Sequence, residues 1–199
     1  MTIGIIGAGN IGSSFAKVLG RAGIDAIISN SRGPDTLKEL VREAGPSIRA
    51  GTREEAAAQD IVLVAVNWSK IPVALRGLPD WNGRIVIDAN NPIEGPLFKP
   101  VELNGRVSSD VFSELVPGAR VVKAFNHLQS QLLATDPKAE GGRRVLFYSG
   151  DDARAKAEVG SLIDRLGFFG IDLGPLSIGG QLVQFPGGPL PVHNLVKFG

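Results

Sequence analysis

The chain has 199 residues, of which 43% are hydrophobic and 21% charged, and its formal net charge is +1. This length suits one sizeable domain with a core, and this charge balance gives no electrostatic reason to expect nucleic acid or a membrane as a partner. The absence of cysteine excludes disulfides, thiolate metal ligands and cysteine nucleophiles, and we expect no metal site. There is no basic leader, and no apolar run approaches the roughly 20 residues that span a bilayer, so we expect a cytoplasmic protein.

Short β-branched runs alternate with helical patterns along the chain, which is typical of a parallel sheet with crossover helices. The predicted strands are residues 3–6, 25–30, 47–50, 61–66, 85–87, 120–123, 144–148 and 168–172. The predicted helices are residues 11–21, 34–43 and 53–58, and a fourth that runs from an aspartate cap at Asp151 or Asp152 to about Leu166. Segments rich in Gly, Pro and Asn predict loops at residues 90–105, 136–142 and from 174 onward.

The order of these elements predicts one α/β domain, residues 1–199, with a doubly wound, mostly parallel sheet of the Rossmann type. Residues 1–135 would form the dinucleotide-binding core. Residues 136–199 would add the last strands, a helix and a short loop-rich C-terminal extension. No internal repeat and no long linker divides the chain into separate domains.

The stretch Gly7-Ala8-Gly9-Asn10-Ile11-Gly12 matches a dinucleotide-binding fingerprint between a strand and a helix. Gly7 permits the tight turn, Gly9 lets a pyrophosphate approach the backbone, and Gly12 lets the helix pack on the strand. Asn10 and Ile11 open a helix whose free amides favour an anion. The alternative is a strand–helix turn that happens to be rich in glycine.

The end of the second strand reads Asn30-Ser31-Arg32, where NAD-binding folds usually carry a carboxylate for the ribose hydroxyls. Ser31 and Arg32 offer a hydroxyl and a guanidinium instead, which suit a 2′-phosphate. We therefore expect NADP(H) as the cofactor in preference to NAD(H). The alternative for Arg32 is an exposed loop arginine without a ligand.

Seven further segments extend this pattern over nearly the whole chain. They are VNWSKIP (66–72), DANNP (88–92), KAFNHL (123–128), SGDDARAK (149–156), DLGPL (172–176), GGQL (179–182) and the SR of residues 31–32. Together with the glycine loop, their order and spacing resemble the NADPH-dependent coenzyme F420 reductases, also called F420-dependent NADP oxidoreductases. The reductase domain fused to membrane metalloreductases is also similar.

The resemblance implies that NADPH lies across the carboxyl ends of the strands and that an acceptor ring stacks on its nicotinamide. The residues that would then border the nicotinamide are Val66, Asn67, Trp68 and Pro72, and residues 123–127, including Ala124, would form the floor where the two rings meet. The acceptor would contact Phe125, Asn126, His127, Gly179, Gly180 and Leu182. His127 would be the candidate proton donor, and a homodimer would be the assembly.

Some of these residues have a plain structural alternative. Trp68 could cover the sheet edge, and His127 could cap a turn. Asp88 could bind backbone amides, Asn90 and Asn91 could form the turn before Pro92, and His193 is expected to be structural or exposed.

We expect an NADPH-dependent oxidoreductase that transfers a hydride between NADP(H) and a small-molecule acceptor: coenzyme F420, a flavin such as FMN or FAD, or another conjugated ring. One alternative is a reductase of another small substrate, such as a hydroxy acid or an imine, although such enzymes usually carry an added helical domain. A second is an NADPH-binding sensor or regulatory module without catalytic activity.

Overall fold

The computed structural model describes residues 1–139 and 141–199. The main sheet contains β1 (Ile3–Ile6), β2 (Ala26–Ser29), β3 (Ile48–Ala50), β4 (Ile61–Val64), β5 (Ile85–Asp88), β8 (Arg120–Ala124), β10 (Gly142–Gly150) and β11 (Phe169–Asp172). The helices are α1 (Asn10–Arg21), α2 (Lys38–Ala44), α3 (Arg53–Ala57), α4 (Ile71–Leu75), α5 (Ser108–Glu114), α6 (Ser130–Ala134) and α7 (Ala153–Arg165).

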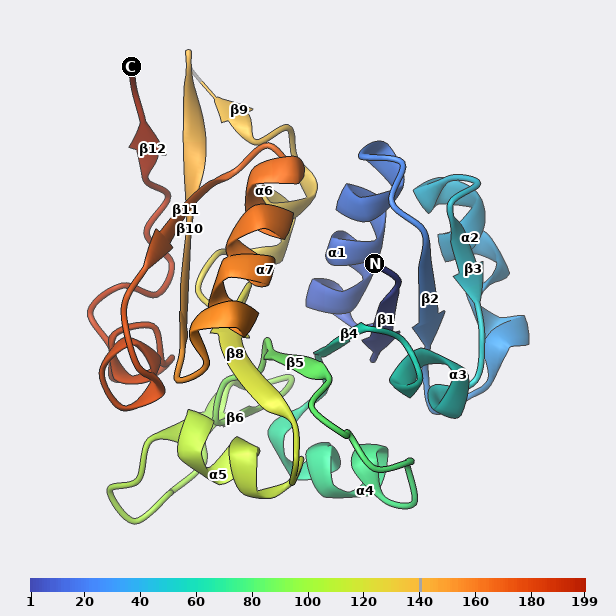
Figure 1. Cartoon of the computed structure of the whole chain (residues 1–199), viewed down its shortest axis with the longest axis horizontal. Helices are drawn as coiled ribbons and strands as arrows, with labels where there is room; N and C mark the ends of the chain where they lie inside the picture. Colours follow the sequence, from blue (N-terminus) through green and yellow to red (C-terminus); the bar gives the residue numbers. More distant parts are fainter. Residues whose placement is uncertain (140) are drawn as a thin grey trace.

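The sheet is mostly parallel, as the alternating pattern predicts. Its strands follow the order β3-β2-β1-β4-β5-β8, all parallel, and then β10 and β11 (Figure 1). β10 runs antiparallel to β8, and β11 runs parallel to β10. The chain order reverses direction between β1 and β4, which is the switch point where ligands bind in open α/β sheets. The Rossmann-type fold is thereby confirmed.

The central strands are buried on both faces, and alternate side chains enter two different cores. Ile5, Leu63 and Ile87 pack under α1, α2, α6 and α7. Val62 and Val86 point the other way and pack with α3, α4 and α5. Figure 1 shows α1, α2 and α7 on one side of the sheet and α3, α4 and α5 on the other. This alternation follows from the twofold side-chain period of a strand.

Several segments predicted as plain loops contain short elements. Residues 90–105 include a two-stranded ribbon, β6 (Ile93–Glu94) and β7 (Lys99–Pro100). β9 (Lys138–Ala139) lies in the predicted break at 136–142, whose residue 140 is outside the described residues, and it pairs with β10. The tail contains a π-helical turn, η3 (Leu176–Gly180), and β12 (Val196–Lys197), which also pairs with β10.

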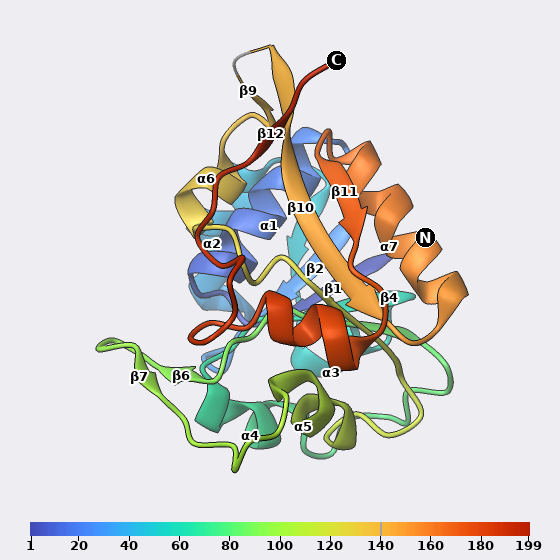
Figure 2. The same ribbon diagram turned by 90° about the vertical axis from the view of Figure 1, so that its left-hand side faces the viewer.

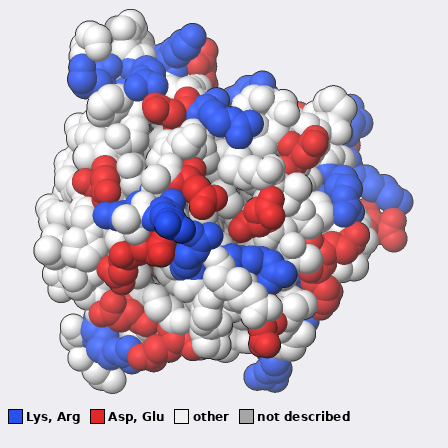
Figure 3. All heavy atoms as spheres, in the orientation of Figure 1, with Lys and Arg blue, Asp and Glu red and all other residues white. Residues whose placement is uncertain are grey.

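The surface is evenly charged where Figure 3 shows it, with basic and acidic side chains interspersed. Ion pairs such as Lys17–Glu43, at 2.6 Å, lie on exposed side chains and contribute little to folding. Within the described residues, no helix combines the length and apolar character needed to cross a membrane.

The C-terminal tail packs against the sheet in front of β10 (Figure 2). Val183 is fully buried against Val145 and Phe147. Beneath this tail lies His127, which is 2% exposed and whose ring centroid is 5.0 Å from that of Phe147. Both ring nitrogens lack a hydrogen bond to the described residues, and the His127 carbonyl accepts one from the Val192 amide.

This burial makes the stability depend on pH. Desolvation lowers the pKa of His127 to about 4, and the nearby Val145 backbone only partly opposes the shift. In the unfolded chain the pKa is about 6.5, so from about pH 6.5 down to 4 the unfolded state binds more protons. The free energy of unfolding should therefore fall as the pH falls through this window, by up to about 3 kcal/mol.

Urea unfolding at a series of pH values measures this dependence, and His127→Leu is the matched variant. The variant should lack the His127 contribution and lose less stability between pH 6.5 and 4. An identical loss in both proteins would show that other groups cause the dependence.

Candidate functional site

A cleft of about 870 Å³ opens at the carboxyl ends of β1, β2, β4 and β5, across the switch point. Its lining comes from segments that are far apart in sequence. The segments are residues 6–11, 29–34, 52–54, 65–67, 70, 73–74, 89–91, 93 and 98. A groove between parallel strands and the helices that follow them is the usual place for a dinucleotide in this fold.

The three fingerprint glycines have different surroundings. Gly7 has φ +109°, and a side chain there would overlap the Ala65 carbonyl. A Cβ on Gly12 would lie 1.9 Å from the Gly7 carbonyl oxygen, so only glycine lets α1 sit this close to β1. Gly9 has open space around its missing side chain, and it lines the cleft. The loop is therefore tight where it packs and open where a ligand would approach.

α1 begins at Asn10, directly after the loop, and Gly9 provides no side-chain cap. Its first turn contains no acidic residue. Asn10 and Ile11 line the cleft, so the positive end of this twelve-residue helix faces it. The free amides of the first turn of α1, the positive end of the helix dipole and the open space at Gly9 together suit a pyrophosphate.

The tip of β2 forms one end of the cleft, where Ser31 and Arg32 line it. The Asn30 side chain accepts from the Arg32 amide at 2.9 Å and donates to Thr36 at 2.9 Å, which fixes the turn. Arg32 is exposed and makes no ion pair with any part of the chain that the structure describes. A guanidinium held beside a groove without a carboxylate partner can bind a phosphate.

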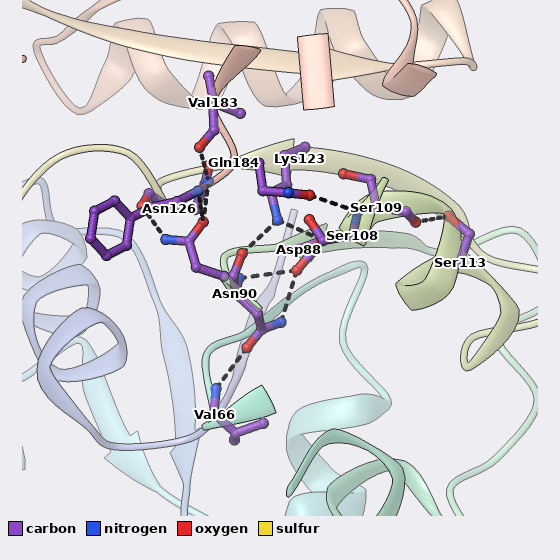
Figure 4. A network of polar contacts seen from close by, with 12 residues as sticks. Val66, Asp88, Asn90, Ser108, Ser109, Ser113, Lys123, Asn126, Val183 and Gln184 are labelled. Carbon is purple, nitrogen blue, oxygen red and sulfur yellow. Dashed lines mark hydrogen bonds and ion pairs between the residues drawn. The ribbon is translucent and has the colours of Figure 1, made fainter. Parts of the chain in front are cut away.

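A buried polar network lies where β4, β5 and β8 end, and Figure 4 shows its side chains. Lys123 donates to Asp88 at 2.9 Å, and both side chains have 0% exposure. The other Asp88 oxygen accepts from the backbone amide of Asn90 at 3.0 Å and from its side-chain nitrogen at 2.8 Å. The side-chain oxygen of Asn90 accepts from the Val66 amide at 2.9 Å. The network thus connects two cleft-lining residues, Val66 and Asn90, to a buried ion pair.

A second set of bonds ties the tail to this edge of the sheet. Asn126 donates from its side chain to the Asn91 side-chain oxygen at 2.9 Å and to the Val183 carbonyl at 2.7 Å. Asn91 donates to the Asn126 carbonyl at 2.8 Å and accepts from the Phe185 amide at 3.1 Å. Asn91 also lines the cleft, so the tail is anchored at the cleft floor.

The structure brings together only part of the predicted cofactor site. Gly7, Gly9, Asn10, Ile11, Ser31, Arg32, Val66 and Asn67 line the cleft. Gly12 supports the loop from behind. Trp68, Pro72 and Ala124 are not among the lining residues. Trp68 is 8% exposed and packs in the core under α4 and α5, and Ala124 is buried in β8.

The predicted acceptor residues lie away from the cleft lining. Phe125 is fully buried with φ +63°, and Asn126 and His127 are covered by the tail. Gly179 and Gly180 face buried serines, because a Cβ would lie 2.4 Å from Ser149 Cβ or 2.7 Å from Ser109 Oγ. Leu182 is partly buried and does not line the cleft. These residues have packing roles here, and their contact with an acceptor stays a prediction, as does proton donation by His127.

Sequence reasoning missed two parts of the site. One is the Lys123–Asp88 pair, whose signal was a lysine inside an apolar strand and an aspartate ending another. The other is the ribbon β6–β7, which brings Ile93 and the exposed Phe98 to the cleft. Glu94 holds this ribbon by accepting from the Ser69 amide at 2.6 Å and hydroxyl at 3.0 Å.

The geometry agrees with known structures. The chain is 47% identical to a hypothetical protein, SMa0349, from Sinorhizobium meliloti, with a TM-score of 0.93 over 99% of this chain and 96% of that one. It is 28% identical to a protein from Arthrobacter sp. FB24 whose description suggests an F420-dependent NADP-reductase, with a TM-score of 0.73 over 88% and 86%.

Among curated proteins, the chain is 28% identical over 190 residues to Metalloreductase STEAP2 of Homo sapiens and of Mus musculus. The match covers 94% of this chain and 36% of each relative, so the chain spans about a third of their length.

Residues 2–92, which contain the glycine loop, the tip of β2 and the ends of β4 and β5, match the family described as NADP oxidoreductase, coenzyme F420-dependent. This part also carries most of the residues that line the cleft. Through residues 2–92 the chain is similar to the coenzyme F420-dependent NADP oxidoreductases.

Proposed function

We propose that the protein binds NADPH in this cleft and catalyses hydride transfer between NADP(H) and a flat, conjugated acceptor, either a deazaflavin such as coenzyme F420 or a flavin. The observation that carries this proposal is the pairing of an open Gly9 with an arginine at the tip of β2 where a carboxylate would repel a phosphate. Both features line one cleft at the switch point of the sheet.

The residues of the chain would bind and orient the cofactor. The α1 amides and Gly9 would receive the pyrophosphate, and Ser31 and Arg32 the 2′-phosphate. The nicotinamide half would then extend toward the ends of β4 and β5. Bound NADPH supplies the hydride.

At that end, Val66, Ile93 and Phe98 offer apolar surface beside the amides of Asn67 and Asn91. Apolar walls would exclude water and hold two flat rings in contact, which is the main contribution a protein makes to hydride transfer. Within the described residues, no cluster of His, Asp and Glu could hold a metal ion.

The test of the function is NADPH oxidation, followed optically, with a panel of coenzyme F420, FMN, FAD, riboflavin and small quinones. Rapid oxidation with a deazaflavin or flavin supports the proposal. Tight NADPH binding without oxidation by any acceptor would favour a sensor. Oxidation of NADPH with quinones alone would show that the acceptor is a quinone and not a deazaflavin or flavin.

We also propose a homodimer. Three apolar side chains along the tail, Val192, Leu195 and Phe198, expose 53%, 44% and 57% of their surface. Groups of exposed apolar side chains are common at subunit interfaces. Sedimentation should show a dimer, and Leu195→Glu should shift it toward monomer. A monomeric wild-type protein would contradict this proposal.

Arg32 should determine the preference for NADPH. A charge-assisted hydrogen bond contributes roughly 1.5–3 kcal/mol, so Arg32→Ala should weaken NADPH binding by roughly 10- to 150-fold. NADH binding should barely change. Calorimetry with both cofactors measures this, and the exposed Arg76, which does not line the cleft, gives the control Arg76→Ala. Equal losses for both cofactors would show that Arg32 does not select the phosphate.

Gly9 should be required for the cofactor and dispensable for the fold. Gly9→Val places its side chain in open space, where a pyrophosphate would approach, so binding should be lost while the melting temperature stays near that of the wild type. The matched variant Gly12→Val should instead fail to fold stably, because its Cβ meets the Gly7 carbonyl. Normal NADPH affinity in a folded Gly9→Val protein would remove the glycine loop from the site.

A further inference from the structure

The buried ion pair between Lys123 and Asp88 is an unfavourable way to stabilise the fold alone. Both side chains are completely buried, and removing charges from water carries a desolvation penalty that their mutual attraction often fails to repay. Apolar side chains of similar volume would fill the same space between β5 and β8 without this penalty. The pair therefore calls for a role beyond packing.

The contacts of the pair converge on one residue. Asp88 accepts two hydrogen bonds from Asn90, one from the backbone amide and one from the side chain. Lys123 also donates to the Asn90 backbone carbonyl. Asn90 is thus held at three points, which fixes both its backbone and the direction of its side-chain amide (Figure 4).

Asn90 connects the ion pair to the lining of the cleft through a hydrogen bond with Val66. Because its side-chain nitrogen faces Asp88, its oxygen faces the Val66 amide and accepts from it. Val66 lies against the glycine loop, since its Cγ1 is 2.8 Å from the position that a Gly7 Cβ would occupy. Residues 65–67 and 89–91 line the cleft after β4 and β5, and β1 separates these strands from β2, whose tip carries Arg32.

We propose that Asp88 and Lys123 are positioning residues for the nicotinamide half of NADPH. They touch no ligand themselves. Through Asn90 they set the position of the Val66 turn and of residues 89–91, against which the nicotinamide ribose and ring would lie. This inference rests on the proposed function, because it requires NADPH in the cleft with its adenosine half at the tip of β2.

A split ligand tests the proposal. Adenosine 2′,5′-bisphosphate carries the adenosine half and its 2′-phosphate but no nicotinamide. Its affinity should therefore not depend on the network around Asp88 and Lys123. Three variants are measured by calorimetry with this ligand and with NADPH: Lys123→Met, Asp88→Asn and the double variant. Each single variant leaves a buried charge without its partner and is expected to be less stable. The double variant leaves none and should fold even where a single variant does not.

The expected result is selective. Lys123→Met and Asp88→Asn should weaken NADPH binding by about 10-fold or more, the loss expected when one hydrogen-bonding group is misplaced, and leave bisphosphate binding within about 2-fold. The double variant should recover part of the NADPH affinity, because it leaves no unpaired buried charge to displace Asn90, while the amide oxygen at position 88 can still accept from Asn90. The fluorescence of bound NADPH should change with the affinity, since it reports the surroundings of the nicotinamide.

Arg144→Met is the matched control for loss of a buried cation. Arg144 is 6% exposed and bonds Thr135, whose carbonyl accepts from Arg21 at the end of α1 far from the glycine loop. This variant should lower the melting temperature without changing the affinity for either ligand.

Four results would overturn the proposal. Unchanged NADPH binding in folded variants would show that the pair does not position the site, and equal losses for both ligands would show a general structural role. If the wild-type protein binds the bisphosphate but not NADPH, or binds neither, the proposed function fails and the inference with it. In the wild-type protein without ligand, rapid hydrogen exchange of the Val66 amide would likewise contradict a fixed turn.

Discussion

Burial of the central parallel strands on both faces is the constraint on which this structure depends. β1, β4 and β5 have no exposed residue, so every side chain on them must pack and every backbone polar group must pair within the sheet. Layers of helices must therefore approach closely from both sides. Gly4 shows how closely, since a Cβ there would lie 1.8 Å from the Ala56 carbonyl oxygen of α3.

The same constraint places the polar chemistry at the strand ends. A parallel sheet leaves its last amides and carbonyls unpaired along one edge, and this is where the glycine loop, the tip of β2 and the Val66 turn meet. The exception is Lys123, whose charge lies inside the sheet and is offset by Asp88 on the neighbouring strand. The interior thus remains neutral while Asn90, at the rim, receives directed hydrogen bonds.

The sequence predicted the sheet and the glycine loop well, because these depend on local patterns. Short β-branched runs such as residues 61–64 favour buried strands, and the roles of Gly7 and Gly12 follow from backbone geometry. The other half of the cleft depends on contacts between distant segments. No local pattern reveals that Asn91 bonds Phe185, 94 residues away, or that Trp68 turns into the core.

The resemblance to a family pointed to segments that reach the cleft, but it did not give the direction of each side chain. VNWSKIP supplies Val66 and Asn67 to the cleft, while Trp68 and Pro72 of the same motif do not line it. KAFNHL is buried under the tail, and its Asn126 serves as an anchor for that tail. Adjacent side chains of one motif point in different directions, so the sequence alone could not show which of them face the cleft and which face the core.

The ribbon β6–β7 forms one wall of the cleft, and this wall is built independently of the cleft floor. Its base is fixed by Glu94 on Ser69 and by the Val101 amide on the Pro92 carbonyl, whereas its tip residues Leu97 and Phe98 are 73% and 62% exposed. Substitutions at the tip can therefore change the shape and polarity of this wall without disturbing the sheet, the glycine loop or the buried ion pair.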